Sequence, residues 1–240
     1  MITELSRDEL VALGARHRAD YLGEQAGYTL EVATADGKAL EELLPEGYIG
    51  EVREALAAVD AARKDKALMA AESKEATNAH HDAYREAKVF RRKVARRALR
   101  ARRMGKAIPD GLIKIDQTHT GPGLVGQVKE MVGLLEANLP ALSGRGANAL
   151  VAKGKALAET LQTVDAKHEA KRLSQLPEAV QRFYMQKAVL YLGIKVIHDA
   201  GMELHADNHA AAARYNLSIL YRNAGHRKPN PAPQPAPVTA

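Results

Sequence analysis

The chain has 240 residues, of which 46% are hydrophobic and only 4% aromatic, a balance that favours a core of closely packed helices rich in alanine and leucine. It contains no cysteine, which excludes disulfides, thiolate metal sites and cysteine nucleophiles. The net charge of +6 is concentrated in residues 85–106, where eleven lysines and arginines stand against one glutamate, so this window carries +10 and the remaining residues about −4.

The N-terminal segment is predicted to be helical from Ser6 onward. The Ser6 hydroxyl can cap this helix, and Glu9, three residues later, completes a capping box. Gly23 and Gly27 weaken the helix. The next stretch, 28–44, begins with strand-like alternation but contains an Asp-Gly turn signal and then returns to a helical pattern. We therefore interpret it as helix, break and short helix.

A very long helix is predicted over 46–104, because this span contains no proline, and no glycine after Gly50. At 1.5 Å per residue it would measure about 85 Å. Its apolar side chains recur roughly every 3.5 residues, which is the spacing of a partial coiled-coil seam. Such a helix needs a partner helix along its length, so we expect the chain to form a homo-oligomer through its long helices. The seam comprises Ile49, Val52, Leu56, Val59, Ala62 and Met69.

The second half of the chain is predicted to repeat this plan of short helices leading into a long one. A short non-helical connection near 105–122 is followed by helices over about 123–138 and 147–175. A second very long helix is predicted over 177–223, because Leu-Pro-Glu precedes it as it precedes the first long helix.

These elements together predict an all-α fold, an elongated bundle of about five helices in one domain over 1–225. A pseudo-repeat of 1–105 and 120–225 is one interpretation of the two halves. In residues 226–240 proline alternates with small or polar residues, which is typical of a flexible or disordered tail.

The basic window is predicted to form one face of the first long helix. At 100° per residue its apolar side chains fall within an arc of about 120°, and the cations centre on the opposite side. Guanidinium groups suit bidentate contact with phosphate or carboxylate, so this face is a candidate site for an anionic partner. The alternative is a solvated face that acidic helices of this chain or of a neighbouring subunit partly neutralise. The candidate residues are Arg85, Lys88, Arg92, Arg96, Arg97, Arg100 and Arg103.

A histidine stripe on the second long helix is a weak candidate for a metal site. His198, His205 and His209 lie at i, i+7 and i+11, and the pair at i and i+4 could chelate a transition metal. His80 and His81 could face them from the other long helix. Hydrogen-bonded histidines at a helix–helix seam are the stronger interpretation, since no glutamate has a histidine three residues later as in di-iron bundles.

Two further patterns give little support to catalysis. Residues 121–126 match G-x-G-x-x-G, but no convincing strand precedes them and no parallel sheet is predicted. A polar patch in the middle of the first long helix carries the residue types of acid–base chemistry, which are also those of an exposed helix surface. We therefore expect no enzyme, no cofactor and no small-molecule substrate. The patch comprises Glu72, Glu75, His80, Asp82 and Tyr84.

The expected function is that of a non-catalytic helical scaffold or adaptor that binds an acidic or anionic partner through the basic helix. One alternative is a nucleic-acid-binding protein, and a second is a protein that lies on anionic membranes. The most apolar segment, 188–197, is interrupted by Lys195 and is too short to span a bilayer. The N-terminus lacks the regions of a secretory signal, so we expect a cytoplasmic protein.

Overall fold

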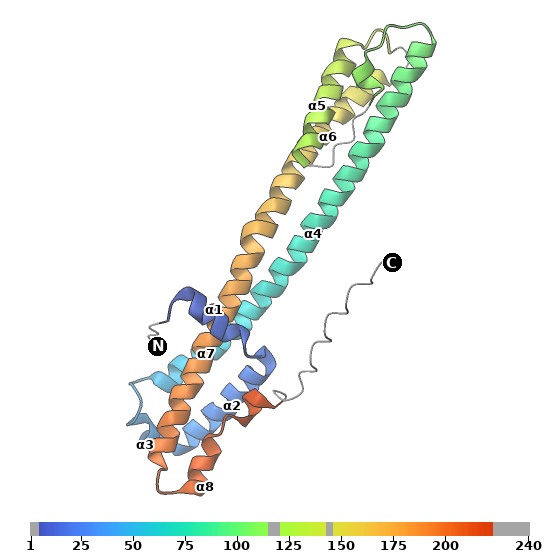
Figure 1. The fold of residues 1–240 in the computed structure, drawn as a ribbon. Helices are drawn as coiled ribbons and strands as arrows, with labels where there is room; N and C mark the ends of the chain where they lie inside the picture. Colours follow the sequence, from blue (N-terminus) through green and yellow to red (C-terminus); the bar gives the residue numbers. More distant parts are fainter. Residues whose placement is uncertain (1–4, 115–120, 143–145, 223–240) are drawn as a thin grey trace, which may run out of the picture. The chain divides into compact units, whose positions relative to one another are not determined.

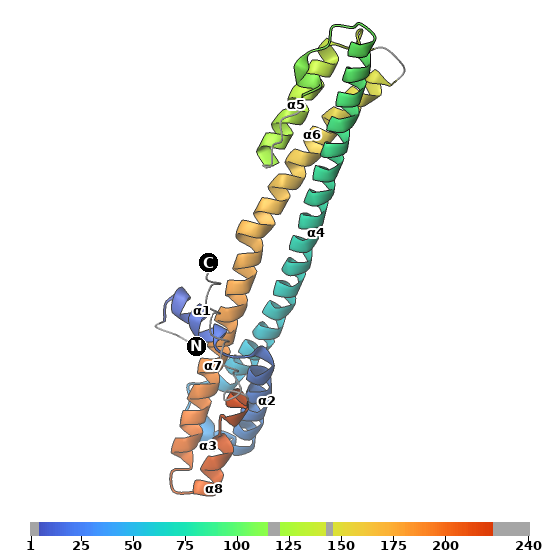
Figure 2. The ribbon, with the colours of Figure 1, turned by 45° about the vertical axis from the view of Figure 1, so that its right-hand side comes forward.

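The computed structural model describes residues 5–114, 121–142 and 146–222. Of the described residues, 84% are helical and none forms a strand, which confirms the predicted all-α class (Figures 1 and 2). The Pro-rich segment 226–240 lies outside the described residues, so its predicted flexibility stays a prediction.

The N-terminal segment forms two helices where one was predicted. Helix α1 spans Arg7–Ala15, and the predicted capping box is confirmed, because the Glu9 amide donates to the Ser6 hydroxyl and the Glu9 carboxylate accepts from the Ser6 amide. The chain then breaks at 16–18, ahead of the two glycines, and helix α2 runs over Ala19–Asp36. Gly23 and Gly27 both lie inside α2, so neither glycine ends the helix.

The ambiguous stretch 28–44 is helix, break and short helix, as interpreted. Helix α2 ends at Asp36, and Gly37 adopts a φ of +54°, a left-handed conformation that glycine accepts without the strain of a Cβ atom. A single turn, α3 (Lys38–Glu41), follows. The predicted first long helix is confirmed as α4, which spans Tyr48–Arg103 and has 56 residues.

The second long helix differs from the prediction at both ends. Helix α5 (Gly121–Ala137) follows a short 3-10 turn at Asp110–Leu112, and helix α6 (Ala147–Ala170) continues through a π turn into α7 (Leu176–Leu204) without a break. Helix α6, the π turn and α7 together form 58 consecutive helical residues. The π turn comprises Lys171–Gln175.

Pro177 therefore does not begin a new helix. A proline inside an α-helix lacks the N–H for the carbonyl four residues earlier and its ring clashes with that carbonyl. The wider π turn ends two residues before Pro177, and such bulges relieve this kind of conflict. The helix also ends at Leu204 instead of 223, because Asn208 caps a new single turn, α8 (His209–Ala212), by accepting from the Ala211 amide.

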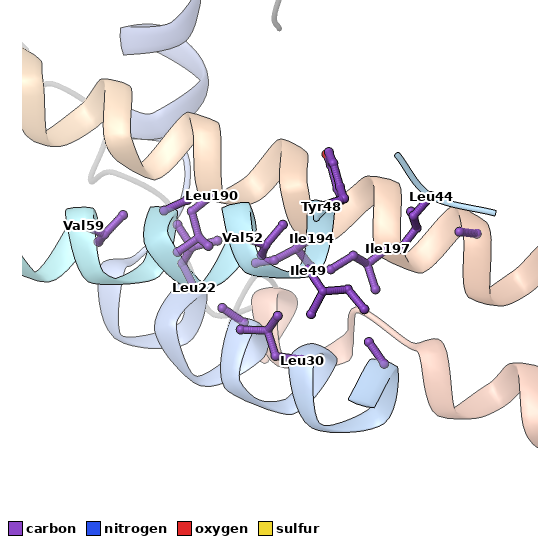
Figure 3. Close-up of a cluster of buried hydrophobic side chains, with 14 of the residues drawn as sticks. Leu22, Leu30, Leu44, Tyr48, Ile49, Val52, Val59, Leu190, Ile194 and Ile197 are labelled. Carbon is purple, nitrogen blue, oxygen red and sulfur yellow. The ribbon is translucent and has the colours of Figure 1, made fainter. Parts of the chain in front are cut away.

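The chain divides into two compact units, each with its own core. The first unit contains residues up to Lys64 and from Val180 onward, and its core packs α2 and α3 against the N-terminal part of α4 and against α7 (Figure 3). Ile49, Val52 and Ile194 lie at its centre. The second unit contains residues 65–179, and in it α5 and α6 lie beside the C-terminal part of α4 (Figures 1 and 2). These boundaries do not follow those of the predicted pseudo-repeat.

Candidate anion-binding face

The orientation of the basic helix is fixed by a stripe of small and apolar side chains on the opposite side of α4. Every third or fourth residue from Ala83 to Ala101 is buried against α5 and α6, and Phe90 is the largest of them. Because these positions recur on one side of the helix, the cations between them must point away from the core. The buried positions of the stripe are Ala83, Ala87, Phe90, Val94, Ala98 and Ala101.

Seven exposed cations make up what we call the basic face. They project from α4 over 19 residues, about 27 Å of helix, within an arc of about 140° at 100° per residue. Six of them are among the seven predicted candidates, and Lys93 is an additional member. The basic face comprises Arg85, Lys88, Arg92, Lys93, Arg96, Arg100 and Arg103.

Arg97, the remaining candidate, belongs to the packing of the second unit. Its side chain is partly buried, and its Nε donates to the backbone carbonyl of Leu142 at 3.2 Å. Arg97 therefore holds the segment that follows α5 against α4. Arg91 is buried as well. Helical periodicity places both side chains between the apolar stripe and the basic face, but the sequence does not reveal the carbonyl that Arg97 reaches.

Acidic groups of the same chain neutralise only part of the basic window. Arg85 pairs with Asp82 at 3.2 Å, with both side chains well exposed. Arg102 pairs with Asp110 at 2.6 Å and also donates to the carbonyl of Ile108. The hydrogen bond from Arg102, together with Lys114, lowers the pKa of Asp110.

The other cations of the basic face remain available to a partner. No ion pair joins any of them to a carboxylate among residues 5–114, 121–142 and 146–222. Residues 65–179 hold 21 lysines and arginines against 13 acids, a net charge of +8 that this face dominates. A surface of this kind attracts anions over distances of about 10 Å at moderate salt. The unpaired members are Lys88, Arg92, Lys93, Arg96, Arg100 and Arg103.

The predicted histidine stripe does not lie along one helix. His198 and His205 are on α7, but the helix ends at Leu204 and His209 begins α8. Nδ1 of His198 donates to the backbone carbonyl of Tyr215. No group of three or more His, Cys, Asp or Glu residues that could hold a metal ion occurs in the described parts of the chain.

His205 belongs to a polar cluster that the sequence did not indicate. The Asp36 carboxylate accepts hydrogen bonds from His205 Nε2 at 2.7 Å, from the Tyr215 hydroxyl at 2.7 Å and from Arg214 Nη2 at 2.8 Å. We call these four residues the Asp36 cluster. Only 11% of the Asp36 side chain is exposed. The cluster fastens the segment after α7 to the C-terminal end of α2.

The environment of the Asp36 cluster shifts two pKa values in opposite directions. Burial would raise the pKa of Asp36, but the hydrogen bonds from His205, Tyr215 and Arg214 outweigh it and lower that pKa to about 2. Burial and the bond to the Asp36 carboxylate raise the pKa of the Tyr215 hydroxyl. Asp36 is thus a permanently charged acceptor at neutral pH, which suits a structural clamp.

Two members of the polar patch, Glu72 and His80, contact α6 or the π turn after it, whereas Asp82 is exposed and pairs with Arg85. His80 Nε2 lies 3.2 Å from Asp165 Oδ1, and its ring stacks on His168 with 4.6 Å between ring centroids. His80 therefore contacts Asp165 and His168, and it does not face His198 and His205 as predicted. Glu72 pairs with Lys171. These contacts join α4 to α6 and to the π turn that follows it.

The G-x-G-x-x-G pattern does not form a dinucleotide site. Its first glycine, Gly121, begins α5, and Gly126 lies inside the helix. The four residues before the pattern lie outside the described residues, and no strand occurs in the part of the chain that is described. The fingerprint requires a strand that leads into the first glycine.

Comparison with known proteins adds no assignment. No protein-family model, curated protein or solved structure matches the chain. Within the described residues, none of the helices combines the length and the apolarity needed to cross a membrane. The class that the fold and the site define is thus an all-α protein with an exposed, mostly unpaired basic helix face.

Proposed function

We propose that this protein is a non-catalytic helical scaffold that self-associates and binds an anionic partner through the basic face of α4. The observation that carries the binding proposal is the row of six exposed cations without a carboxylate partner in the described chain, held outward by a buried stripe. Burial of that stripe fixes the direction of the side chains before any partner arrives. A preorganised surface loses less conformational entropy on binding than a flexible basic tail.

Duplex nucleic acid is a second candidate, and the composition of the basic face favours it over single strands. Five of the seven cations are arginines, whose guanidinium groups can contact phosphate oxygens in pairs. The only large apolar side chains exposed between them are Val89 and Leu99, both aliphatic. Recognition of single strands relies on aromatic side chains on which bases stack, and the basic face has none.

Reversing three charges tests the binding proposal. We expect Arg92→Glu, Arg96→Glu and Arg103→Glu together to weaken binding of a polyanion by about 100-fold or more, because three attractive contacts become repulsive. Binding is measured by fluorescence anisotropy against labelled duplex DNA and labelled polyglutamate, and by flotation with vesicles that contain phosphatidylserine. If five phosphates are contacted, the logarithm of the duplex affinity falls by about 4 to 5 per tenfold increase in salt.

A matched control separates the basic face from net charge. The triple variant Lys74→Glu, Lys129→Glu and Lys153→Glu changes the charge of the second unit by the same amount at exposed positions outside the face. It should retain most of the affinity. Equal losses in the two triple variants, or wild-type protein that binds none of the three probes at low salt, would refute the proposal.

A further inference from the structure

Part of the second unit has no core of its own. Between residues 65 and 82 of α4, and between 162 and 178 of the chain through α6 and the π turn, no side chain is buried. The third helix of this unit, α5, packs against α4 from Ala83 onward, where the buried stripe begins, and not along the preceding residues (Figures 1 and 2). We call these two stretches the central helix pair. Two helices alone bury little apolar surface, and their stability in water is marginal.

The contacts that hold the central helix pair together are polar. Glu72 pairs with Lys171, and His80 contacts Asp165 and His168. These contacts set an antiparallel register in which Glu72 and Lys171 lie at the same level. They leave apolar side chains uncovered, among them Leu68, which is 55% exposed, and Leu173, which is 62% exposed.

A groove of about 470 Å³ runs between the two helices, and its walls carry opposite charges. The α4 wall presents Glu72 and Glu75, while the opposite wall presents Lys167 and Lys171. Three alanines between these charges keep the groove shallow, so that a third or fourth helix could approach closely. They are Ala76, Ala79 and Ala170.

We propose that a second copy of this chain occupies the groove, with a twofold axis parallel to the helices of the central pair. Rotation by 180° about such an axis places α4 of one copy over α6 of the other. The glutamate wall of each copy then faces the lysine wall of its partner, at the level that the Glu72–Lys171 pair defines. A twofold axis across the helices would instead place α4 over α4 and bring like charges together.

The arrangement completes a four-helix bundle in which all neighbouring helices are antiparallel. Such bundles bury a central seam that two helices cannot form. Eighteen residues span about 27 Å, and two helices are about 20 Å wide, so the dimer would bury about 1,000 Å² in total. That area lies at the lower end of specific interfaces, so we expect a weak dimer.

The test reverses the charges of one groove wall at a time in the full-length chain. Sedimentation equilibrium measures the molecular mass of each variant from 1 to 100 µM. We expect wild-type protein to dimerise in this range. The variant Glu72→Lys, Glu75→Lys has two positive walls, and the variant Lys167→Glu, Lys171→Glu has two negative walls. Each should be monomeric alone, while an equimolar mixture should form a heterodimer, because every wall then faces its opposite.

Two outcomes would overturn the proposal: wild-type protein that stays monomeric up to 100 µM, or single-wall variants that dimerise like wild type. A control variant, Lys74→Glu with Arg172→Glu, reverses two charges on the sides of the helices away from the groove and should dimerise normally. Circular dichroism confirms that each variant is helical. The inference rests on the self-association in the proposed function, but monomeric protein that still binds polyanions would overturn it without affecting the basic face.

Discussion

Replacing Asp36 by alanine is expected to lower the free energy of unfolding by about 3 kcal/mol, because three donors lose one buried acceptor. The Tyr215 hydroxyl and the His205 ring are partly buried and cannot turn fully to water. Arg214 is more exposed and recovers part of its hydration. Urea denaturation measures the loss, and hydrogen exchange should show faster opening of residues 209–222.

The Asp36 contribution also has a defined dependence on pH. Its pKa is about 2 in the folded chain against an ordinary value of 3.8, so folding favours the charged form. The stabilisation is complete above pH 3.8 and disappears as pH falls toward 2; the shift corresponds to about 2 kcal/mol. The stability difference between wild type and Asp36→Asn should therefore shrink below pH 4. A difference that stays constant from pH 6 to pH 2.5 would contradict this.

Asp20 supplies the matched control for Asp36. It is paired with Arg63 at 2.8 Å, but both side chains are more than half exposed. Exposed pairs contribute little, so Asp20→Ala should cost less than about 1 kcal/mol. If the two alanine variants were equally unstable, burial of the Asp36 cluster would not be the cause.

Gly14→Ala is expected to displace α1 from α7 and to destabilise the first unit by about 3 kcal/mol. A Cβ atom at Gly14 would overlap the backbone carbonyl of Tyr184, lying 2.7 Å from its carbon. Backbone atoms cannot move aside as a flexible side chain can, so the helices must separate and Leu10 loses its burial. Thermal unfolding and protease cleavage within residues 7–15 measure the effect.

The same substitution at Gly27 is expected to raise the free energy of unfolding instead of lowering it. Gly27 lies in the middle of α2, and a Cβ atom there meets nothing within 4 Å. Alanine restricts the unfolded chain and favours the helix, so Gly27→Ala should stabilise by about 0.5 to 1 kcal/mol. If both variants were destabilised alike, close approach at Gly14 would not explain the loss.

Local sequence signals predicted the parts of the fold that local physics controls. The capping box at Ser6, the glycine break after Asp36 and the uninterrupted course of α4 depend on residues within a few positions of one another. The direction of the basic face followed from periodicity for the same reason. Whether the basic face binds a partner stays a proposal.

The remaining features depend on contacts that no local pattern contains. Asp36 meets partners 169 to 179 positions away, and its Asp-Gly context indicated only a turn. The Leu-Pro-Glu sequence predicted a helix start at 177. The helix is nevertheless continuous, because α6 before this point packs in the core of the second unit and α7 after it packs in the core of the first. The π turn accommodates the proline. The end of α7 could have been found from Asn208, a strong N-cap residue before an alanine run.

The buried stripe beneath the basic face also restricts which anions fit it well. Since the α4 backbone is held by its core, the spacing of the cations along the axis is set by the helical rise and cannot follow the shape of a ligand. A stiff polyanion that already matches this spacing loses little freedom on docking, whereas a floppy chain of equal charge must be ordered first. Among polyanions of equal charge density, the protein should bind rigid ones more tightly than flexible ones.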